Sequence, residues 1–563
     1  MTTSITRHFA SITKGRWGPR QVHYRRIGSG PVVLCLHQSP LSSRDMLATM
    51  ERWKTHFTCI APDTPGFGLS DPLGVNRAEA SDFAEAVVEF MDALGIERAA
   101  VYGFHTGAMI TGALAAAYPD RIVCAAANGY VIMTETDRQD FIEHYLPPLQ
   151  PKWDGSHLTW LWARMREQLI FFPWYRKSST ARLSFDVPPA EALHNSLLDF
   201  MRAGDHYRVG YRAAFTMRSD LALRQTKTPM LVTAADTDVL SADLDNVRHP
   251  AACVTVARGG PADQTLDLCR DYIKRHKPPK MPKSTVNSGL RGRLWQDYVD
   301  VDGGQLRIRR NADAGGRPVL ILHEAGGSTE SIESLASGFI GRRPVLAINL
   351  PGHGESDNTL PRGKVTVGGF AKAIEAALQS LDIDEVDVIG VGSSAFIAFE
   401  LASLAKNRVR HAVMLGAMLV DETLRDELIE NYTPDIKPLW YGGHLVEAWY
   451  VVRDQRLFWP WFRQRRNNII HNETELDPAH LQGRLLDLFR SHGMWRHAHQ
   501  AAFTYPWKKK LAKARQSVLL AAPMGDPLKP AAVQAASEMP HLLFVELPRE
   551  PQDWAHALLQ KLT

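Results

Sequence analysis

The chain has 563 residues, of which 45% are hydrophobic and 22% are charged. A chain of this length and composition is expected to form two or more globular domains, which excludes a disordered, collagen-like or coiled-coil protein. Its 65 basic and 61 acidic residues give a net charge of only +4, so the composition predicts no binding to nucleic acid or to a membrane surface.

The cysteines and the N-terminal residues indicate the cellular compartment in which the protein is expected. The five cysteines all lie in the first half of the chain and form no CxxC pair, so we interpret them as free thiols in a reducing environment. The N-terminal segment lacks the apolar core of a signal peptide, and no window reaches the roughly 18 apolar residues of a membrane span. We therefore expect a cytoplasmic protein without a membrane partner.

In the first half of the chain, short apolar runs alternate with helical patterns. The expected elements are strands at 31–37, 57–63, 99–104, 229–240 and 253–259 and helices at 41–53, 80–95 and 107–119. A long, helical, Trp-rich insertion separates the third strand and its helix from the last two strands. This alternation predicts a mostly parallel, doubly wound α/β sheet, whose functional groups lie at the carboxyl ends of the strands.

The second half of the chain repeats the first. Six landmarks recur 286 to 288 residues apart: His37 and His323, Pro65 and Pro351, Gly103 and Gly390, Gly155 and Gly442, Ala213 and Ala501, and Asp238 and Asp526. This near-constant spacing indicates a tandem duplication of a whole domain and not a solenoid of short repeats. Duplicated domains often descend from homodimers, so we expect the copies to form an intramolecular pseudo-dimer.

The composition between the copies favours a linker. The segment HKPPKMPKSTVNSG is rich in Pro, Lys and Ser, as expected of an extended, exposed connection. The expected organisation is a first domain at 1–276 with a helical insertion at about 141–217, a linker at 277–289, and a second domain at 290–563 with an insertion at about 428–507.

Four motifs of the first copy occur in a fixed order. They are the loop HQSP at 37–40, the turn D-x-P-G-x-G-x-S at 63–70, the strand-to-helix turn between Gly103 and Gly107, and Asp238 after a late strand. In this order they resemble the motifs of the α/β-hydrolase superfamily. The resemblance implies two tandem α/β-hydrolase folds, each a mostly parallel doubly wound sheet whose insertion forms a helical cap.

The nucleophile position departs from the family pattern. The family's strand-to-helix turn exposes a Ser, Asp or Cys. The first copy instead has His105, in GFHTG, and the second has Gly392, in GVGSS. Neither copy has a His in the loop after its last strand, where the third member of a catalytic triad would stand. The Ser-His-Asp mechanism is therefore not expected in either copy, and the second copy is expected to be non-catalytic.

His105 can still support chemistry in the first copy. Its imidazole is long enough to enter the space of the missing triad His and meet Asp238, which would give a His-Asp general base. Ser39 or a water would then be activated, with the backbone N–H groups of Gln38 and Thr106 as oxyanion donors. Activation of this kind predicts hydrolysis, whereas direct removal of a substrate proton predicts a lyase or an isomerase.

The cap would cover this site and supply an aromatic, largely apolar pocket for a small-molecule substrate. The candidate substrate-binding residues are His37, His157, Arg166 and Trp174. No Walker loop, G-x-G-x-x-G motif or metal-ligand spacing stands out, so we expect no cofactor and no metal.

Two functions follow from these observations. The first is a cofactor-independent hydrolase or lyase that acts on a small apolar carbonyl, ester or lactone compound through His105. The second is a catalytically inactive double pseudo-hydrolase that binds a small ligand or acts as a scaffold. The turn around His105, which keeps both glycines, favours the first, whereas the missing nucleophile and loop His favour the second.

Overall fold

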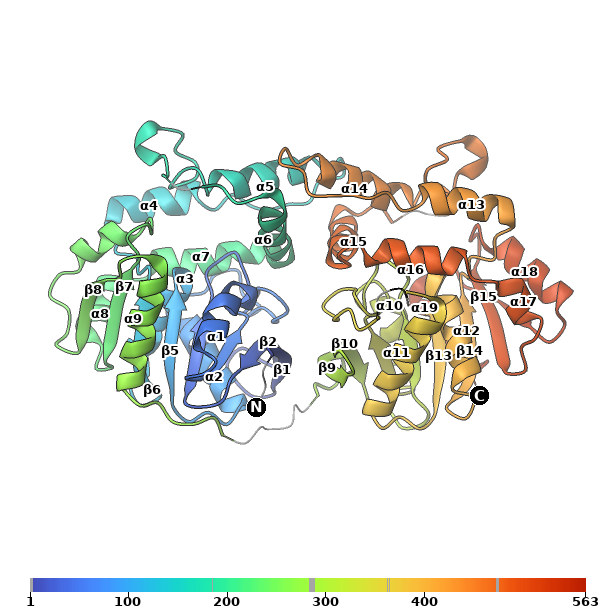
Figure 1. The fold of residues 1–563 in the computed structure, drawn as a ribbon, viewed down its shortest axis with the longest axis horizontal. Helices are drawn as coiled ribbons and strands as arrows, with labels where there is room; N and C mark the ends of the chain where they lie inside the picture. The colour runs from blue at the N-terminus through green and yellow to red at the C-terminus, as the bar shows by residue number, and fades with distance from the viewer. Residues whose placement is uncertain are drawn as a thin grey trace. The chain divides into compact units, whose positions relative to one another are not determined.

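The structure is a computed structural model that describes residues 4–184, 186–282, 289–361, 363, 365–471 and 475–562. The expected linker lies partly outside the described residues, because positions 283–288 are not among them. The chain divides into unit 1, with residues 1–150 and 157–288, and unit 2, with residues 151–156 and 289–563. The short segment 151–156, which the sequence placed in the first cap, thus groups with unit 2. In Figure 1, unit 1 runs from blue to green and unit 2 continues to red.

Unit 1 is built on one sheet of eight strands. The strands are β1 (Thr6–Ile12), β2 (Arg20–Ile27), β3 (Val32–Leu36), β4 (Thr58–Pro62), β5 (Ala99–Phe104), β6 (Ile122–Asn128), β7 (Met230–Ala234) and β8 (Val254–Arg258). Their spatial order is β1-β2-β4-β3-β5-β6-β7-β8, parallel except for the pairs that involve β2. The order reverses at β3, so the carboxyl ends of β3 and β5 meet at the switch point where such sheets bind ligands.

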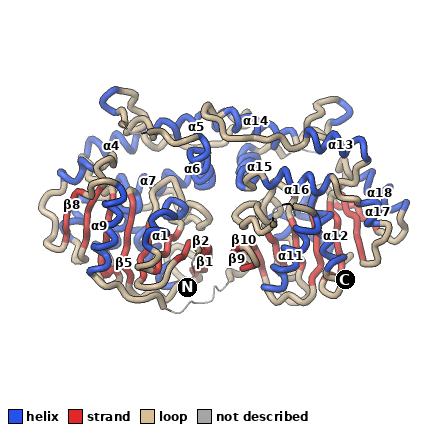
Figure 2. Tube along the Cα trace, viewed as in Figure 1, coloured by secondary structure: helices blue, strands red, loops and turns tan. Residues whose placement is uncertain are grey.

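Helices cover both faces of this sheet (Figure 2). The helices are α1 (Leu47–Trp53), α2 (Ala80–Ala93), α3 (Thr106–Ala117), α4 (Glu135–His144), α5 (Ser156–Glu167), α6 (Ala190–Ala203), α7 (Tyr207–Thr216), α8 (Ser219–Gln225) and α9 (Ala262–Arg275), with 3₁₀ turns η1 (Ser43–Met46), η2 (Ser179–Ala181), η3 (Gly204–His206) and η4 (Ser241–Asn246). Because successive strand residues point to opposite faces, Leu34 packs with Phe83 of α2 on one face while Cys35 packs with Trp53 of α1 on the other. The two buried clusters fix the sheet between two layers of helices.

The cap of unit 1 is the insertion α4 to α7 between β6 and β7. Its interior is aromatic: the Phe141 and Tyr145 rings stack with centroids 5.3 Å apart, and Tyr145 meets Phe215 edge-on at 5.2 Å. Such pairs add about 0.5–1.5 kcal/mol each to the free energy gained by burial. The aromatic side chains therefore hold the cap helices together.

Unit 2 repeats this architecture. Its strands are β9 (Trp295–Val301), β10 (Gly304–Asn311), β11 (Val319–Leu322), β12 (Val345–Ile348), β13 (Val386–Val391), β14 (Val409–Leu415), β15 (Ser517–Pro523) and β16 (Leu543–Leu547). Its helices are α10 (Glu333–Ser337), α11 (Val367–Ser380), α12 (Ala395–Leu404), α13 (Glu422–Asn431), α14 (Gly443–Asp454), α15 (Pro478–Arg490), α16 (Met494–Phe503), α17 (Trp507–Leu511), α18 (Lys529–Glu538) and α19 (Pro551–Leu559), with 3₁₀ turns η5 (Gly392–Ser394) and η6 (Arg466–Asn468). The strand order β9-β10-β12-β11-β13-β14-β15-β16 matches that of unit 1, which confirms the two tandem α/β folds.

The sequence missed some elements of unit 1. The five predicted strands and the helices at 80–95 and 107–119 are confirmed, but β1, β2 and β6 were not anticipated. The segment at 41–53 is a 3₁₀ turn, η1, followed by the short helix α1. β2 carries three arginines among its eight residues, and its charged and apolar residues do not alternate with a period of two, so the pattern does not mark it as a strand.

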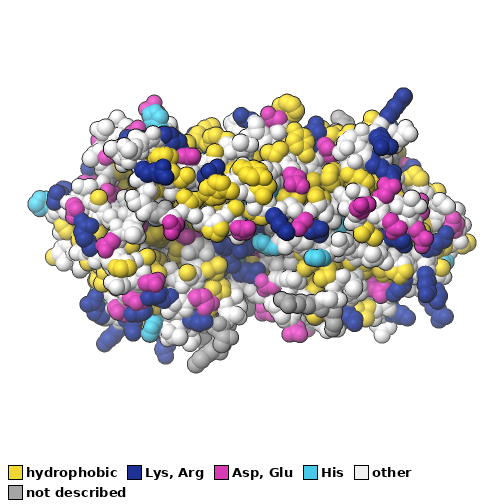
Figure 3. Space-filling view, turned by 45° about the horizontal axis from the view of Figure 1, so that its top comes forward, with side chains coloured by type: hydrophobic (Ala, Val, Ile, Leu, Met, Phe, Trp, Pro, Cys, Tyr) yellow, Lys and Arg dark blue, Asp and Glu magenta, His cyan; other side chains and the backbone are white. Residues whose placement is uncertain are grey.

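The surface agrees with the small net charge. On the face drawn in Figure 3, basic and acidic side chains are interspersed and do not gather by sign. Among the residues that the structure describes, no helix combines the length and the apolar character needed to cross a bilayer.

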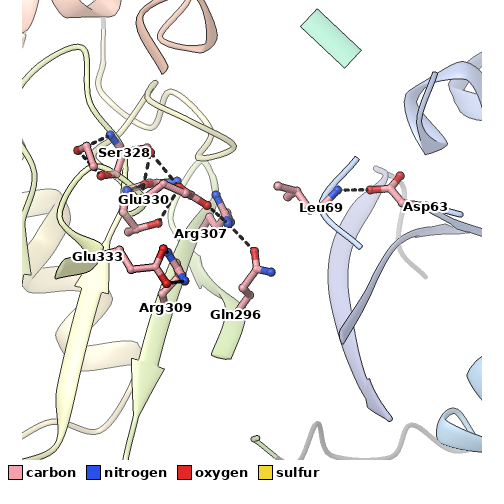
Figure 4. Close-up of polar contacts among 11 residues, drawn as sticks. Asp63, Leu69, Gln296, Arg307, Arg309, Ser328, Glu330 and Glu333 are labelled. Carbon is pink, nitrogen blue, oxygen red and sulfur yellow. Dashed lines mark hydrogen bonds and ion pairs between the residues drawn. The ribbon is translucent and has the colours of Figure 1, made fainter. Parts of the chain in front are cut away.

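A buried carboxylate holds the turn after β4. Asp63 accepts the Leu69 N–H at 2.8 Å, the contact drawn in Figure 4. It also accepts the Ser43 N–H at 2.7 Å, and His23 Nδ1 lies 2.8 Å from its Oδ2. Burial opposes ionisation of Asp63, but the charge and hydrogen bond of His23 hold its pKa well below the usual value. A Cβ on Gly68, whose φ is 53°, would come within 2.0 Å of this carboxylate, so the turn requires glycine there.

Unit 2 holds the same turn with a neutral side chain. Asn349 replaces the aspartate, and its Oδ1 accepts the Thr329 N–H at 2.7 Å. In place of a histidine, the neighbouring strand β10 carries Arg307, which contacts Gln296 and Glu330 (Figure 4). The turn geometry therefore needs an oxygen acceptor, and the charge on Asp63 is an additional feature of unit 1.

Asp63→Asn, which copies unit 2, should lower the unfolding free energy of unit 1 by about 2–3 kcal/mol near pH 7, because a buried charged acceptor beside His23 is lost. The folded-state pKa of Asp63 is depressed, so its stabilisation is present above the unfolded pKa near 3.9 and is lost as the pH falls through the folded value. Denaturant unfolding at several pH values should show the difference shrinking towards pH 3. A pH-independent difference would contradict this account.

Candidate active site

The turn between β5 and α3 holds His105 in a backbone conformation that few residues adopt. Its φ is 48° and its ψ is −112°. A Cβ on Gly103 would come within 2.2 Å of the Gly107 oxygen, and one on Gly107 within 2.2 Å of the Leu36 oxygen, so both positions need glycine. The His105 N–H donates to the Asn128 carbonyl at 3.0 Å. The turn therefore presents residue 105 at the carboxyl ends of the strands.

The imidazole of His105 meets the carboxylate of Asp238, as the sequence predicts. The His105 Nε2 lies 2.9 Å from Asp238 Oδ2 and 3.1 Å from Oδ1. Asp238 follows β7, its side chain is only 6% exposed, and its Oδ1 accepts the Leu240 N–H at 2.9 Å. Gly129 makes room for the ring, because a Cβ there would lie 2.3 Å from His105 Cδ2.

This contact fixes the tautomer of His105. Burial opposes ionisation of Asp238, but the hydrogen bond and charge of His105, together with the Leu240 N–H, hold the pKa of Asp238 below its usual value. An ionised carboxylate can only accept hydrogen bonds, so Nε2 carries a proton. In the neutral ring Nδ1 is then the atom that can accept a proton. The Phe104 ring packs 4.1 Å from the imidazole, centroid to centroid, and restricts its rotation.

The loop after β3 is tied to the start of α3. The Ser39 N–H donates to Thr106 Oγ1 at 2.6 Å, and the Thr106 hydroxyl donates to Ser39 Oγ at 3.2 Å. The Tyr211 hydroxyl, from the cap, donates to the Ser39 carbonyl at 2.6 Å. The first N–H groups of a helix have no intrahelical acceptor and carry positive partial charge, so the Thr106 N–H suits an oxyanion.

Gln38, the other predicted oxyanion donor, already has an acceptor nearby. Its backbone N–H lies 3.4 Å from Asp45 Oδ2, and its side-chain Nε2 lies 3.3 Å from Oδ1. Burial raises the pKa of Asp45, against the opposing effect of His37 and of these hydrogen bonds. An oxyanion would therefore compete with Asp45 for the Gln38 N–H.

A cavity of about 450 Å³ lies beside His105, within the range of small-molecule sites. Its wall joins the strand ends to the cap and is mainly apolar. The polar lining residues are Gln38, Ser39, His105, Thr106, Tyr145, Gln168, Ser196 and Tyr211. Among the described residues that line the cavity there is no Lys, Arg, Asp or Glu.

Four residues predicted to bind substrate do not line this cavity in the part of the chain that the structure describes: His37, His157, Arg166 and Trp174. His37 is buried, its Nδ1 lies 2.8 Å from the Gln38 oxygen, and its Nε2 accepts the Thr64 N–H at 2.9 Å. Trp174 donates from Nε1 to the Tyr145 oxygen at 3.3 Å. These contacts make His37 part of the loop and Trp174 part of the cap, and substrate binding by the four residues stays a prediction.

The cavity adds residues that the sequence did not single out, chiefly Gln168, Ser196 and Tyr211. A comparison of the two copies in the sequence could have indicated Ser196 and Tyr211. At the repeat spacing, Ser196 is matched by Arg484 and Tyr211 by His499, so the copies differ at these positions.

The equivalent place in unit 2 is filled. Gly392, with φ of 58°, replaces His105, and a Cβ there would come within 3.0 Å of the Glu324 side chain. Glu324, which matches Gln38, forms an ion pair with Arg484 at 2.5 Å. The pocket around this ion pair has a volume of only about 20 Å³. Charged side chains thus fill in unit 2 the space that is a cavity in unit 1.

Among the residues that the structure describes, no group of three or more His, Cys, Asp or Glu side chains is arranged to hold a metal ion.

The two sheets with inserted caps, the turns after β5 and β13 and the acids after β7 and β15 define α/β-hydrolase domains. Residues 31–167 and 317–458 each match the family model described as the alpha/beta hydrolase fold. The chain therefore belongs to the α/β-hydrolase family, as a tandem pair of such domains.

Curated relatives match parts of the chain. Haloalkane dehalogenase 2 of Mycobacterium tuberculosis is 33% identical over 105 residues, which are 18% of this chain and 36% of that protein. The 2-(acetamidomethylene)succinate hydrolase of Mesorhizobium japonicum is 32% identical over 122 residues, which are 22% of this chain and 44% of the relative. The chain thus spans less than half the length of these relatives.

Solved structures are also similar. The crystal structure of E-2-(acetamidomethylene)succinate hydrolase is 21% identical and has a TM-score of 0.36, and the match covers 48% of this chain and all of that one. That of an enol-lactonase from Burkholderia xenovorans is 17% identical with a TM-score of 0.34, and the match covers 45% of this chain and 97% of that one.

Gly129→Ala should displace the His105 ring, because the new Cβ would lie 2.3 Å from its Cδ2. Gly416→Ala in unit 2 is the matched control: its φ is also positive, but its Cβ would meet only Asp526 Oδ2, at 3.7 Å. Both variants should lose about 1 kcal/mol of stability from backbone strain. Only Gly129→Ala should shift the imidazole resonance of His105 in an NMR spectrum. Equal spectra for the two variants would contradict the packing described for His105.

The buried carboxylate of Asp243, in η4, lowers the stability of the fold when it is ionised. Burial raises its pKa to about 6, although its Oδ2 accepts the Ile132 N–H at 3.0 Å. The folded protein therefore binds this proton more tightly than the unfolded chain. The cost is fully present above about pH 6 and is relieved as the pH falls towards 3.8.

Asp243→Asn should keep the hydrogen bond through its amide oxygen and raise the unfolding free energy by about 1–2 kcal/mol at pH 8. The gain should vanish near pH 4, where the wild-type carboxyl is protonated when folded. Thermal unfolding at the two pH values measures the effect. A gain of equal size at both would disprove this account of Asp243.

Proposed function

We propose that unit 1 is a cofactor-independent hydrolase in which His105, oriented by Asp238, is the general base. The substrate would be a small, largely apolar ester, lactone or related carbonyl compound held beneath the cap. The observation that carries the proposal is the 2.9 Å contact of His105 Nε2 with Asp238, at the wall of a 450 Å³ cavity. Curated relatives whose names denote hydrolases support the reaction class.

In the proposed reaction, a water gives a proton to His105 Nδ1 while its oxygen bonds to the carbonyl carbon of the substrate. The carbonyl electrons move to the oxygen, which the Thr106 N–H stabilises at the start of α3. When the bond to the leaving oxygen breaks, the proton on Nδ1 passes to that oxygen. The products are an acid and an alcohol, or one hydroxy acid from a lactone, and His105 returns to its neutral form.

Water is preferred to Ser39 as the nucleophile. The Ser39 Oγ is hydrogen-bonded by Thr106, and among the contacts of the described residues it forms no hydrogen bond with His105. Asp238 would remain charged throughout, and it would stabilise the imidazolium that forms during the reaction.

His105→Ala and Asp238→Asn should each lower turnover by roughly 10²–10⁴-fold, the usual contribution of a positioned base and its orienting acid. Asp526→Asn, at the matching position of unit 2, is the control and should leave turnover within about twofold of wild type. The measurement is a screen of the purified chain against aryl esters, lactones and β-diketones, followed by kcat/KM for each variant on the best substrate.

The outcomes separate the competing functions. Wild-type turnover in His105→Ala would disprove the assignment of the base. Turnover of β-diketones but not of esters would indicate hydrolysis of an activated carbon–carbon bond, in which water adds to a carbonyl and an enolate leaves in place of an alcohol. Binding without turnover of any class would favour a pseudo-hydrolase that only holds its ligand.

A further inference from the structure

A buried cation stands directly behind the cavity wall of unit 1. Arg164, in α5, is only 1% exposed, and its guanidinium lies over the rings of Trp174 at 4.4 Å and Tyr145 at 5.1 Å. Among the described residues no carboxylate forms an ion pair with it, and its Nε and Nη2 have no hydrogen-bond acceptor. The two rings offset part of the desolvation cost, but they supply no negative charge.

A buried guanidinium without a carboxylate partner lowers the stability of the fold. A buried, unpaired charge usually destabilises a fold, and buried N–H groups without acceptors add to the penalty. An arginine that served only packing could be replaced at this site by an apolar side chain of similar length. The cost therefore points to a negative charge that is present only when a ligand is bound.

One side chain connects this cation to the cavity. The Arg164 Nη1 donates to Gln168 Oε1 at 2.8 Å, and Gln168 lines the cavity. On its other side the amide has only a weak partner, because Gln168 Nε2 lies 3.6 Å from the Met165 sulfur. A hydrogen bond from a cation polarises the amide and strengthens its N–H groups as donors. Gln168 thus has donor capacity that protein groups do not use fully.

The two copies differ at this feature in an informative way. At the repeat spacing Arg164 is matched by Val451, so unit 2 has no equivalent cation in α14. Arg484, whose side chain is 10% exposed, lies beside the filled pocket of unit 2 and pairs with Glu324. The residue of unit 1 that matches Glu324 is the neutral Gln38. In unit 2 a protein carboxylate pairs with the cation, whereas among the described residues of unit 1 none pairs with Arg164.

We infer that the ligand of the unit 1 cavity carries a carboxylate, which accepts a hydrogen bond from Gln168 Nε2 and is stabilised by the charge of Arg164 behind it. This inference rests on the proposed function only in taking the cavity as the substrate site. The rest of the ligand contacts apolar cap residues such as Phe141 and Leu193, so the substrate class is an apolar acid that also bears the reacting carbonyl.

The test is a binding measurement that needs no turnover. Calorimetry of the full chain with 4-phenylbutyrate and with its neutral analogue 4-phenylbutanamide compares the same apolar group with and without charge. Wild type should bind the carboxylate at least about tenfold more tightly. Arg164→Met, which removes the charge but keeps an unbranched side chain, should remove that preference, and Gln168→Leu should reduce it by a similar factor.

Matched variants identify the cause. Arg166→Met removes a cation two residues away that does not line the cavity, and Arg164→Lys keeps the charge; both should retain the preference. His105→Ala should also retain it, so a failed carboxylate preference is distinguishable from a failed catalytic assignment. In ligand-free protein, Arg164→Met should leave the melting temperature unchanged or raise it, because an unpaired buried charge is removed.

Several results would overturn the inference. One is equal affinity of wild type for the two probes, and another is a preference that survives in Arg164→Met. A clear fall in the melting temperature of ligand-free Arg164→Met, with the preference intact in Gln168→Leu, would show that the arginine is structural.

Discussion

The backbone at His105 is the constraint on which the rest of unit 1 depends. A non-glycine residue at φ 48° and ψ −112° costs of order 1–3 kcal/mol, and it persists only where the surrounding structure over-determines it. Here β5, α3 and two close-packed glycines impose the turn, and the contact with Asp238 fixes the ring that the turn presents. Unit 2 keeps the turn with Gly392 at φ 58° and has no side chain there. The fold therefore supports the turn independently of any side chain.

The difference between the units lies in where charge is buried. In unit 2 burial opposes ionisation of Glu324, yet the nearby Arg484 and Arg456 hold its pKa below the usual value, so a satisfied ion pair fills the pocket. In unit 1 the matching positions are Gln38, Ser196 and Leu169, which are uncharged and line an open cavity. A few substitutions on one scaffold are thus enough to exchange a filled pocket for an open cavity.

The sequence predicts the parts that depend on local pattern. The central strands, the turn at His105 and its meeting with Asp238 follow from short motifs and from the shared edge of a parallel sheet. Gly129 and Gln168 were not predictable, because their roles arise from packing between segments distant in sequence. The role of Arg164 is not visible in the sequence for a related reason. Arg166 recurs in both copies, whereas the significance of Arg164 depends on the absence of a carboxylate around it.

The place of the proposed base, His105, limits the chemistry open to unit 1. In a catalytic triad, nucleophile, base and acid are three side chains. Here the imidazole of His105 occupies the nucleophile's position and is hydrogen-bonded to Asp238. The turn itself therefore offers no hydroxyl or thiol for a covalent intermediate. The pair can still transfer a proton, either from water or from a substrate carbon. Which of these occurs depends on the atom held against Nδ1, and hence on how the ligand is oriented. A fixed anchor in the cap, remote from the base, would make that choice without any change at His105.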